Sequence, residues 1–333
     1  MTYQYSQHKA YMDLLRSRNE VPYVRSFPDN PAAGDRLVIL PAEDTASTSR
    51  GRPIGPEYFD VNEKLAFMDV HGIDVSVISL ANPWLDWLPS ETAAEAARMI
   101  NDDTEKLCAD HEGRLYAFAT LPLSASSGEI VREIERAAGL KHMRGIVMGS
   151  SGLGAGLDDP ALDPVEYGHV LPLALGFPLE TTIAVTRMLL AGVFDRFPKL
   201  NVMIAHSGGT LPFLAGRIES CIAHDAHLKK EGRIVNRRSL WDVLKSNIYL
   251  DAVIYADVGL KAAVDASGAD RLMFGTDHPF FPPLDKGEKE WQSVTLNSNA
   301  VTSAFGEDTK AAEAVMGGNA MRILRLGSWS PLA

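Results

Sequence analysis

The sequence predicts an α/β protein built around a parallel sheet, with a (β/α)8 barrel as the favoured form of that sheet. From residue 60 onward, short apolar runs that indicate buried strands alternate with helical patterns, as parallel strands joined by right-handed crossovers require. No Gly-x-Gly-x-x-Gly follows the first strand, which disfavours a dinucleotide-binding sheet. His206 and Asp277 each end an apolar run, where a barrel carries its catalytic groups.

The elements follow one another in a regular order after an irregular start. A short helix is expected over 8–19, and residues 21–56 are rich in Pro, Gly and Arg and are expected to form an inserted irregular loop. Strands are expected at 73–80, 115–121, 145–148, 201–206, 248–251 and from Leu272 onward. Helices are expected at 61–71, 91–111, 127–138, 179–194, 211–227, 240–245, 257–266 and 297–326.

These strands are too few for the eight of a closed barrel. The stretch between Met148 and Asn201 shows one helix and no strand, and the amino end shows no strand either. We therefore expect a single domain over 1–333 with an incomplete barrel whose first and fifth strands are missing. The glycine-rich run from Ser151 to Gly156 is expected to be a flexible loop, because Asp158 and Pro160 follow it where a phosphate site needs a helix.

Composition excludes several classes of partner. The net charge of −11 argues against nucleic acid or an anionic membrane. No apolar run approaches the ~18 residues of a membrane span, and the polar amino end is unlike a signal peptide. Two cysteines suit a reducing compartment. We expect a cytoplasmic protein that binds a small-molecule partner. A homodimer is one oligomeric state that the sequence allows.

His206 and Asp277 are the main candidates for a site. An imidazole and a carboxylate can share a divalent metal or relay a proton, although each residue could equally cap the helix that follows. His278, beside Asp277, is a candidate for supporting a metal ligand. Arg50 and Arg52 could clamp a carboxylate or form a solvated basic turn.

Trp84 follows the strand that ends at Leu80. Its ring could stack on an aromatic acid at the carboxyl end of the strand, or it could pack the loop down, which the sequence alone favours slightly.

Several motifs resemble the amidohydrolase-related metal enzymes, above all the branch of decarboxylases that act on 2-amino-3-carboxymuconate-6-semialdehyde and on aromatic acids. The motifs are Ile204-Ala-His-Ser-Gly-Gly-Thr-Leu-Pro212, Tyr249-Leu-Asp251, Leu272-Met-Phe-Gly-Thr-Asp-His-Pro279, Phe194-Asp-Arg-Phe-Pro198 and Gly318-Asn-Ala-Met-Arg-Ile-Leu324. The resemblance covers residues 8 to 326. It implies a distorted (β/α)8 TIM barrel that holds one divalent metal, commonly zinc.

The resemblance also implies roles for particular residues. Asp277 matches the metal ligand of the eighth strand, and His206 matches the catalytic histidine of the sixth. The His-x-His of the first strand is replaced by Tyr3 and Tyr5. The histidine of the fifth strand falls in the stretch without an expected strand, where His169 lies in an expected loop.

The function implied is a metal-dependent, non-oxidative decarboxylase of an aromatic or unsaturated carboxylic acid. In this interpretation an arginine holds a substrate carboxylate, with Arg52 as the first candidate and Arg50 as the second. His206 transfers a proton. Two alternatives stay open. One is a metal-dependent hydrolase on the same scaffold. The other is a truncated relative with impaired catalysis, because a zinc site needs three protein ligands.

Overall fold

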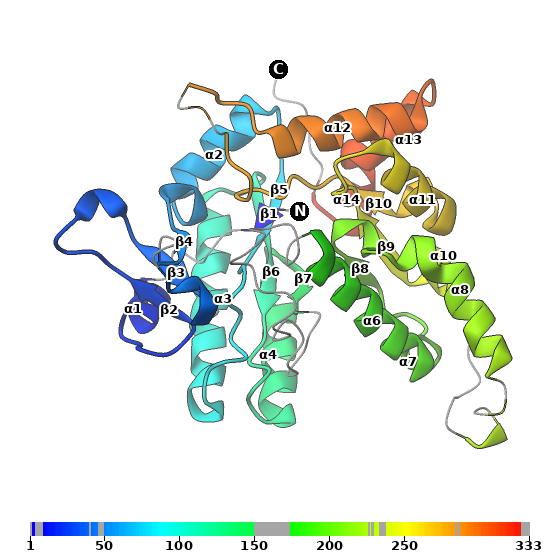
Figure 1. Ribbon diagram of the computed structural model, residues 1–333, viewed down its shortest axis with the longest axis horizontal. Coiled ribbons are helices and arrows are strands. Elements are labelled where there is room, and N and C mark those ends of the chain that lie inside the picture. Colours follow the sequence, from blue (N-terminus) through cyan, green and yellow to red (C-terminus); the bar gives the residue numbers. More distant parts are fainter. Residues whose placement is uncertain are drawn as a thin grey trace. The chain divides into compact units, whose positions relative to one another are not determined.

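The structure is a computed structural model whose chain divides into two compact units. It describes residues 2–3, 9–39, 41–45, 50–149, 174–225, 227, 230–232, 238–283, 285 and 287–327. The amino-terminal unit comprises 2–172, 277–291 and 326–333, and the carboxyl-terminal unit comprises 173–276 and 292–325 with Met1. Figure 1 labels the helices and strands of both units.

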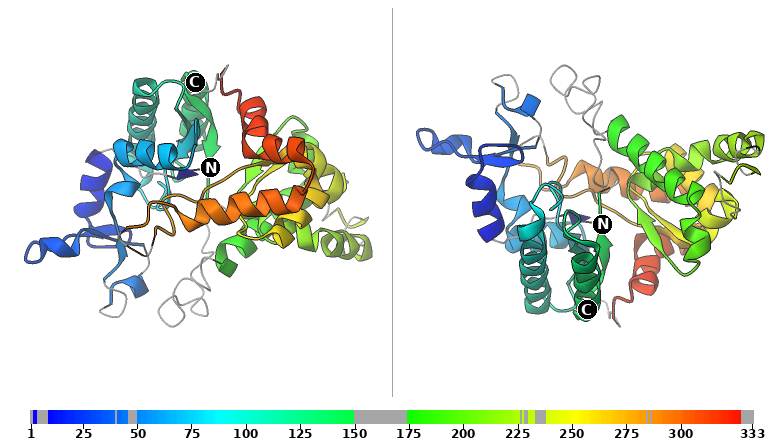
Figure 2. Two further views of the ribbon diagram at one scale, coloured as in Figure 1. Left: turned by 90° about the horizontal axis from the view of Figure 1, so that it is seen from above. Right: turned by 90° about the horizontal axis from the view of Figure 1, so that it is seen from below.

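A four-stranded parallel sheet forms the centre of the amino-terminal unit. Its order is β1 (Thr2–Tyr3), β5 (Ser76–Ser79), β6 (Leu115–Thr120) and β7 (Met143–Val147). Every residue of β5 and β6 is buried, because both faces of such parallel strands are covered. Helices α3 (Ser90–Asp110) and α4 (Ser127–Ala138) pack side by side along this sheet (Figures 1 and 2).

The prediction that the first strand is missing is wrong. β1 pairs in parallel with β5, with Thr2 opposite Ile78 and Tyr3 opposite Ser79. Two residues are too few for a strand pattern to emerge from the sequence. The region of the expected fifth strand, including Ser151 to Gly156, lies outside the described residues, so its absence stays a prediction.

Residues 21–56 are more regular than we expected. They contain an antiparallel sheet of β2 (Tyr23–Arg25), β3 (Arg36–Val38) and β4 (Arg52–Pro53). Single turns separate these strands: η1 (Pro31–Ala33) and η2 (Pro41–Glu43), with η3 (Pro56–Tyr58) after them. The expectation of an irregular loop was therefore wrong, because strands of two or three residues leave no readable alternation.

Local capping sets where two helices of this unit begin. The Ser126 side chain accepts from the backbone N–H of Glu129, and the Glu129 carboxylate accepts from Ser126, which completes a capping box at α4. Asp60 caps α2 (Val61–Val70) by accepting from the backbone N–H of Asn62. The remaining helix is α1 (Lys9–Arg16).

The carboxyl-terminal unit carries a three-stranded parallel sheet. Its order is β10 (Leu272–Met273), β9 (Ile248–Asp251) and β8 (Val202–Ile204). The surrounding helices are α6 (Phe177–Leu190), α7 (Val193–Arg196), η6 (His206–Gly208), α8 (Leu211–His224), α10 (Leu240–Ser246), α11 (Asp257–Ser267), η7 (Ala269–Arg271), α12 (Gln292–Phe305), α13 (Thr309–Glu313), η8 (Ala314–Gly318) and α14 (Asn319–Ile323). One apolar core, which includes Leu189, Phe194, Leu250 and Leu260, joins this sheet to its helices.

A second apolar core, around Tyr11, Leu15, Leu85 and Ile100, belongs to the amino-terminal unit. No described helix is long and apolar enough to cross a membrane. The prediction of one domain spanning 1–333 stays a prediction.

Candidate functional site

His206 stands where β8 ends, in a turn with an unusual backbone. His206 and Ser207 have φ values of 54° and 51°. The left-handed region costs a non-glycine residue roughly 1–2 kcal/mol. Strain of this kind persists only where the surroundings fix it, and it gathers at functional sites. The His206 side chain is half-buried.

The two glycines that follow are required by close packing. Gly208 and Gly209 also have positive φ, at 81° and 64°. A Cβ at Gly209 would lie 2.2 Å from the carbonyl oxygen of Pro178, at the start of α6. The Thr182 hydroxyl accepts from the backbone N–H of Thr210 at 3.0 Å and so holds the turn against α6. The His-Ser-Gly-Gly motif is therefore a backbone requirement as well as a chemical signature.

Asp277 repeats this backbone feature. It is 7% exposed and its φ is 55°. Its carbonyl accepts from the backbone N–H of Phe280 at 2.8 Å, which closes a tight turn. Asp277 belongs to the amino-terminal unit and His206 to the carboxyl-terminal unit. The prediction that the two side chains converge on one cavity stays a prediction.

His278 lies in a buried aromatic cluster. Its ring centroid is 3.8 Å from that of Phe67 and 4.5 Å from that of Trp291. The pKa of His278 is lowered to about 2, mainly by burial and to a smaller extent by the nearby Lys64 and His71. Burial thus favours the neutral form of the His278 imidazole. His71 belongs to the same cluster, where its Nε2 accepts from the Trp291 backbone N–H at 3.2 Å.

Lys64 is a buried amine that the sequence did not single out. Its side chain is 0% exposed, and its Nζ makes no hydrogen bond to any other residue that the structure describes. The amine lies 4.7 Å from the centre of the Phe67 ring. Burial lowers the pKa of Lys64 well below its ordinary value. A lysine in a helix usually points to solvent, so no sequence signal marked this one.

The two arginines singled out from the sequence differ in their surroundings. Arg52 is half-buried in β4, and its Nε donates to Glu43 Oε1 at 2.7 Å. Glu43 is 7% exposed and also accepts from the backbone N–H of Ile39 at 2.8 Å. Arg50 is exposed, and its guanidinium lies 3.6 Å from the carboxylate of Asp44. Arg52 is thus the more fixed of the two.

Tyr58 lies near both Arg52 and Asp277, and sequence reasoning missed it. The pKa of the Tyr58 phenol is raised to about 12, mainly by burial and also by the charges of Glu57 and Asp277, against the opposing charge of Arg52. Its ring meets Phe280 edge to face, with the centroids 6.0 Å apart. The structure therefore brings Arg52, Tyr58, Asp277 and Phe280 into one neighbourhood.

Trp84 packs its own loop. Its indole N–H donates to the carbonyl of Leu80 at 3.1 Å. Its ring lies so close to Gly149 that a Cβ there would be 2.9 Å from the ring. These contacts match the interpretation in which Trp84 packs the loop down.

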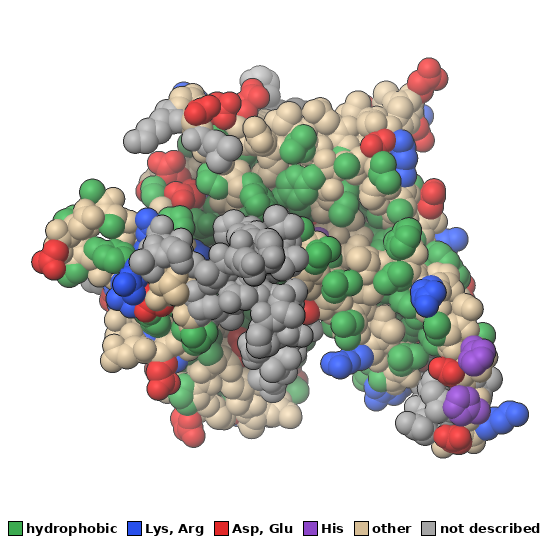
Figure 3. Space-filling model, in the orientation of Figure 1, with side chains coloured by type: hydrophobic (Ala, Val, Ile, Leu, Met, Phe, Trp, Pro, Cys, Tyr) green, Lys and Arg blue, Asp and Glu red, His purple; other side chains and the backbone are tan. Residues whose placement is uncertain are grey.

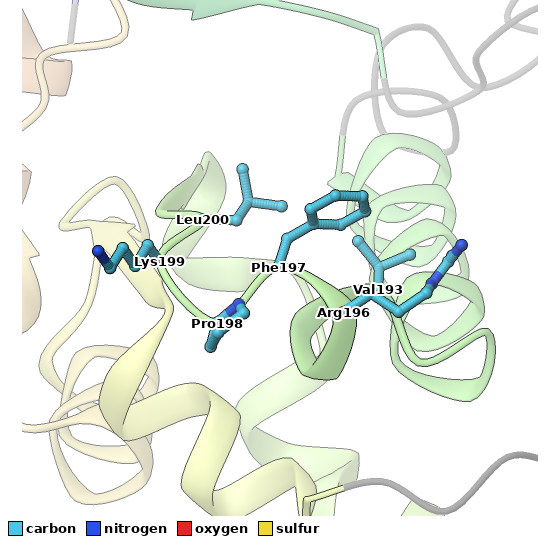
Figure 4. A pocket seen from close by; sticks show the side chains of 6 residues that line it. All are labelled: Val193, Arg196, Phe197, Pro198, Lys199 and Leu200. Carbon is cyan, nitrogen blue, oxygen red and sulfur yellow. The ribbon is translucent and has the colours of Figure 1, made fainter.

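A shallow hollow of about 610 Å³ lies in the carboxyl-terminal unit. Val193, Arg196, Phe197, Pro198, Lys199 and Leu200 line it (Figure 4). This segment precedes β8, whereas His206 follows that strand. The hollow therefore lies at the amino end of β8, at the opposite end from the His206 turn.

The residues that the structure describes supply only part of the ligand set that the metal prediction requires. Within the described ranges, no three His, Cys, Asp or Glu side chains come together as a metal site requires. Asp277 is the one predicted ligand among these residues. They do not by themselves make a complete metal centre.

Comparison with known proteins places these features in a family. The amidohydrolase family matches residues 54–326. The crystal structure of Metarhizium anisopliae IDCase in apo form is 50% identical, with a TM-score of 0.88 over 98% of this chain and 96% of that one. The 2-amino-3-carboxymuconate-6-semialdehyde decarboxylase of Dictyostelium discoideum is 27% identical over 83% of this chain and 79% of its own. The gamma-resorcylate decarboxylase of Rhizobium sp. (strain MTP-10005) is 28% identical over 65% and 76%.

These relatives confirm the resemblance drawn from the sequence motifs. They also give the fold as the TIM-barrel-like α/β architecture of such enzymes. The family match covers most of the 333 residues, including His206, Asp277 and both glycines of the turn. The chain therefore belongs to the amidohydrolase family.

Proposed function

We propose that this chain is a metal-dependent, non-oxidative decarboxylase of an aromatic or unsaturated carboxylic acid. The observation that carries the proposal is its similarity, over most of its length, to enzymes named as decarboxylases of such acids. The similarity to IDCase at 50% identity supports enzyme status. The hydrolase and the impaired relative are not favoured.

The chemical step needs one proton at the right place. Loss of CO2 breaks the bond between the carboxylate carbon and the substrate skeleton and leaves the electron pair on that skeleton carbon. A general acid must then protonate this carbon. We assign this role to His206, because imidazole exchanges protons near neutral pH. The fixed backbone of the turn suits a catalytic group whose orientation toward the substrate matters.

The substrate carboxylate needs a cation. We propose Arg52, since Glu43 uses its Nε and Nη2 and so fixes the plane of the guanidinium. Five N–H donors in a rigid fork allow an arginine to bind a second carboxylate. Arg50 is the alternative cation, and Trp84 is proposed as an apolar wall beside the acid, although it packs its own loop.

A divalent metal is expected from the family, with Asp277 as the proposed ligand and zinc as the proposed ion. Such an ion would supply positive charge for a substrate oxygen. His278, buried beside Asp277, is proposed to fix that carboxylate through packing. Asp277 would need further ligands from outside the described residues to hold such an ion.

The test is CO2 release by the full chain from a panel of acids that includes gamma-resorcylate and 2,3-dihydroxybenzoate. We expect CO2 release from at least one acid, and a loss of roughly 100- to 10,000-fold in kcat for His206→Asn. Ester and lactone substrates form the control arm. Cleavage of those substrates without CO2 release from any acid would overturn the proposal in favour of a hydrolase.

A further inference from the structure

The His206 turn is a run of four residues with positive φ, from His206 through Gly209. Glycine adopts this region readily, but His206 and Ser207 do not. Without restraining contacts, these two residues would adopt an ordinary backbone conformation, and the His206 imidazole would point in another direction. Something in the structure must hold them in place.

Asp251 holds them. It is 2% exposed and ends β9, the strand that pairs with β8 through Ile204 and Leu250. Its Oδ1 accepts from the backbone N–H of Ser207 at 2.8 Å. The Ser207 hydroxyl in turn donates to the Asp251 carbonyl at 2.8 Å. The turn after β8 is thus fastened at two points to the end of β9.

The carboxylate also shapes its own strand end. The same Oδ1 accepts from the backbone N–H of Val253 at 3.2 Å. One oxygen atom therefore ties the turn after β8 to the loop after β9, and both lie in the carboxyl-terminal unit.

We propose that Asp251 is a positioning residue for His206. It fixes the Ser207 amide, keeps the turn left-handed and so sets the direction in which the imidazole points. Its Oδ1 accepts from two neutral backbone amides, those of Ser207 and Val253, so the role requires an acceptor oxygen at this place and no negative charge. The inference rests on the proposed function for its catalytic consequence, whereas its effect on the turn can be measured without activity.

Three variants of the full chain separate positioning from general stability. Asp251→Ala removes the acceptor, and Asp251→Asn keeps an oxygen that can accept from Ser207. Asn247→Ala is the matched control. Asn247 is 0% exposed, and its amide donates to the carbonyls of Pro198 and Leu200 at 3.1 and 2.7 Å. That side chain fastens the other end of the same strand pair.

We expect Asp251→Ala to lower kcat on gamma-resorcylate, or on the best acid of the panel, by about 10- to 100-fold. Its KM should stay within about threefold. Asp251→Asn should stay within about fivefold of the parent in kcat, because the acceptor is kept. Asn247→Ala should lower the melting temperature and leave kcat unchanged. Equal losses of kcat in Asp251→Ala and Asn247→Ala, or in Asp251→Ala and Asp251→Asn, would overturn the proposal.

Amide hydrogen exchange of Ser207 gives a readout that does not depend on activity. The amide should be protected in the parent and in Asp251→Asn, and should exchange at least about 100-fold faster in Asp251→Ala. Unchanged protection in Asp251→Ala would overturn the positioning role. If the parent releases no CO2 while Asp251→Ala loses protection, the decarboxylase proposal fails and the fixing of the turn stands.

Discussion

At the scale of single residues, three of the proposed site residues share a backbone feature that the sequence did not reveal. His206, Asp277 and Arg50 were chosen from the sequence, and all three have positive φ in the structure. Lys64 and Tyr58 were not chosen, because a lysine in a helix and a tyrosine in a loop are ordinary in any sequence. Their burial results from tertiary packing, which no local pattern encodes.

Replacing Lys64 with methionine should stabilise the protein. The pKa of Lys64 is lowered in the folded state because burial penalises its charged form. The unfolded chain therefore holds this proton more tightly, and the free energy of unfolding rises with pH between the folded pKa and the ordinary value of 10.5. The penalty is complete below that window and absent above it.

We expect Lys64→Met to raise the free energy of unfolding at neutral pH by about 1–4 kcal/mol. This gain should shrink as the pH approaches 10.5, the ordinary value. Urea unfolding at several pH values measures both effects. Lys261→Met is the control, because Lys261 is half exposed, pairs with Asp257 and should change stability by no more than about 0.5 kcal/mol. A gain from Lys64→Met that does not change with pH would contradict the argument.

Arg52 should govern substrate affinity. Removing a charged hydrogen-bond donor costs about 1.5–3 kcal/mol, so Arg52→Ala should raise KM for the carboxylic acid by roughly 10- to 100-fold. Steady-state rates of CO2 release at several substrate concentrations give this KM. Arg25→Ala is the control from the same antiparallel sheet, since Arg25 pairs with Asp44 and Tyr23. Equal effects of the two changes on KM would show that Arg52 acts only through the sheet.

At the scale of elements, the sequence predicted what was long or strongly patterned. Residues 127–138 and 248–251 were expected as a helix and a strand, and the structure has α4 and β9 over those ranges. Strand β8 is shorter than expected, because the chain leaves the sheet at Ala205 to enter the turn. The short strands β1 to β4 were missed, since two or three residues carry no period.

Figure 3 shows hydrophobic side chains on the surface of the carboxyl-terminal unit. Leu179, Ile183 and Phe213, on α6 and α8, are 44%, 52% and 85% exposed. Helical periodicity predicted these helices, but it did not predict that apolar residues would lie on the outside.

A substitution at Gly209 should test how tightly the turn is packed against α6. Gly209→Ala places a Cβ 2.2 Å from the Pro178 carbonyl oxygen, at a φ of 64°. Gly306 has a φ of 55° and nothing within 4 Å of such a Cβ. Gly306→Ala should cost about 1 kcal/mol from the backbone alone, whereas Gly209→Ala should cost at least about 3 kcal/mol because backbone must also move. Thermal unfolding of both variants measures the difference, and equal costs would show that the contact with Pro178 relaxes freely.

At the scale of the whole molecule, the family supplies what the described residues do not: a reason to expect a metal. Asp277 is the proposed metal ligand, yet Tyr3 and Tyr5 stand where the resemblance expects two histidines. The site is therefore expected to hold its ion weakly, because useful affinity needs about three protein ligands. This leads to a prediction about metal and activity together.

Chelation followed by gel filtration should remove the metal from the chain and abolish CO2 release, and added Zn²⁺ or Mn²⁺ should restore it.

Replacing both tyrosines, Tyr3→His with Tyr5→His, adds two imidazole ligands. Each well-placed ligand strengthens binding, so zinc should remain bound through gel filtration and the concentration for half-maximal activity should fall at least roughly 10-fold. The matched control is Tyr3→Phe with Tyr5→Phe, which changes the same positions without adding ligands. Elemental analysis gives the zinc content in each case. One tightly held zinc per unaltered chain would show that its ligands lie elsewhere, and the assignment of Tyr3 and Tyr5 to the histidine positions would then be wrong.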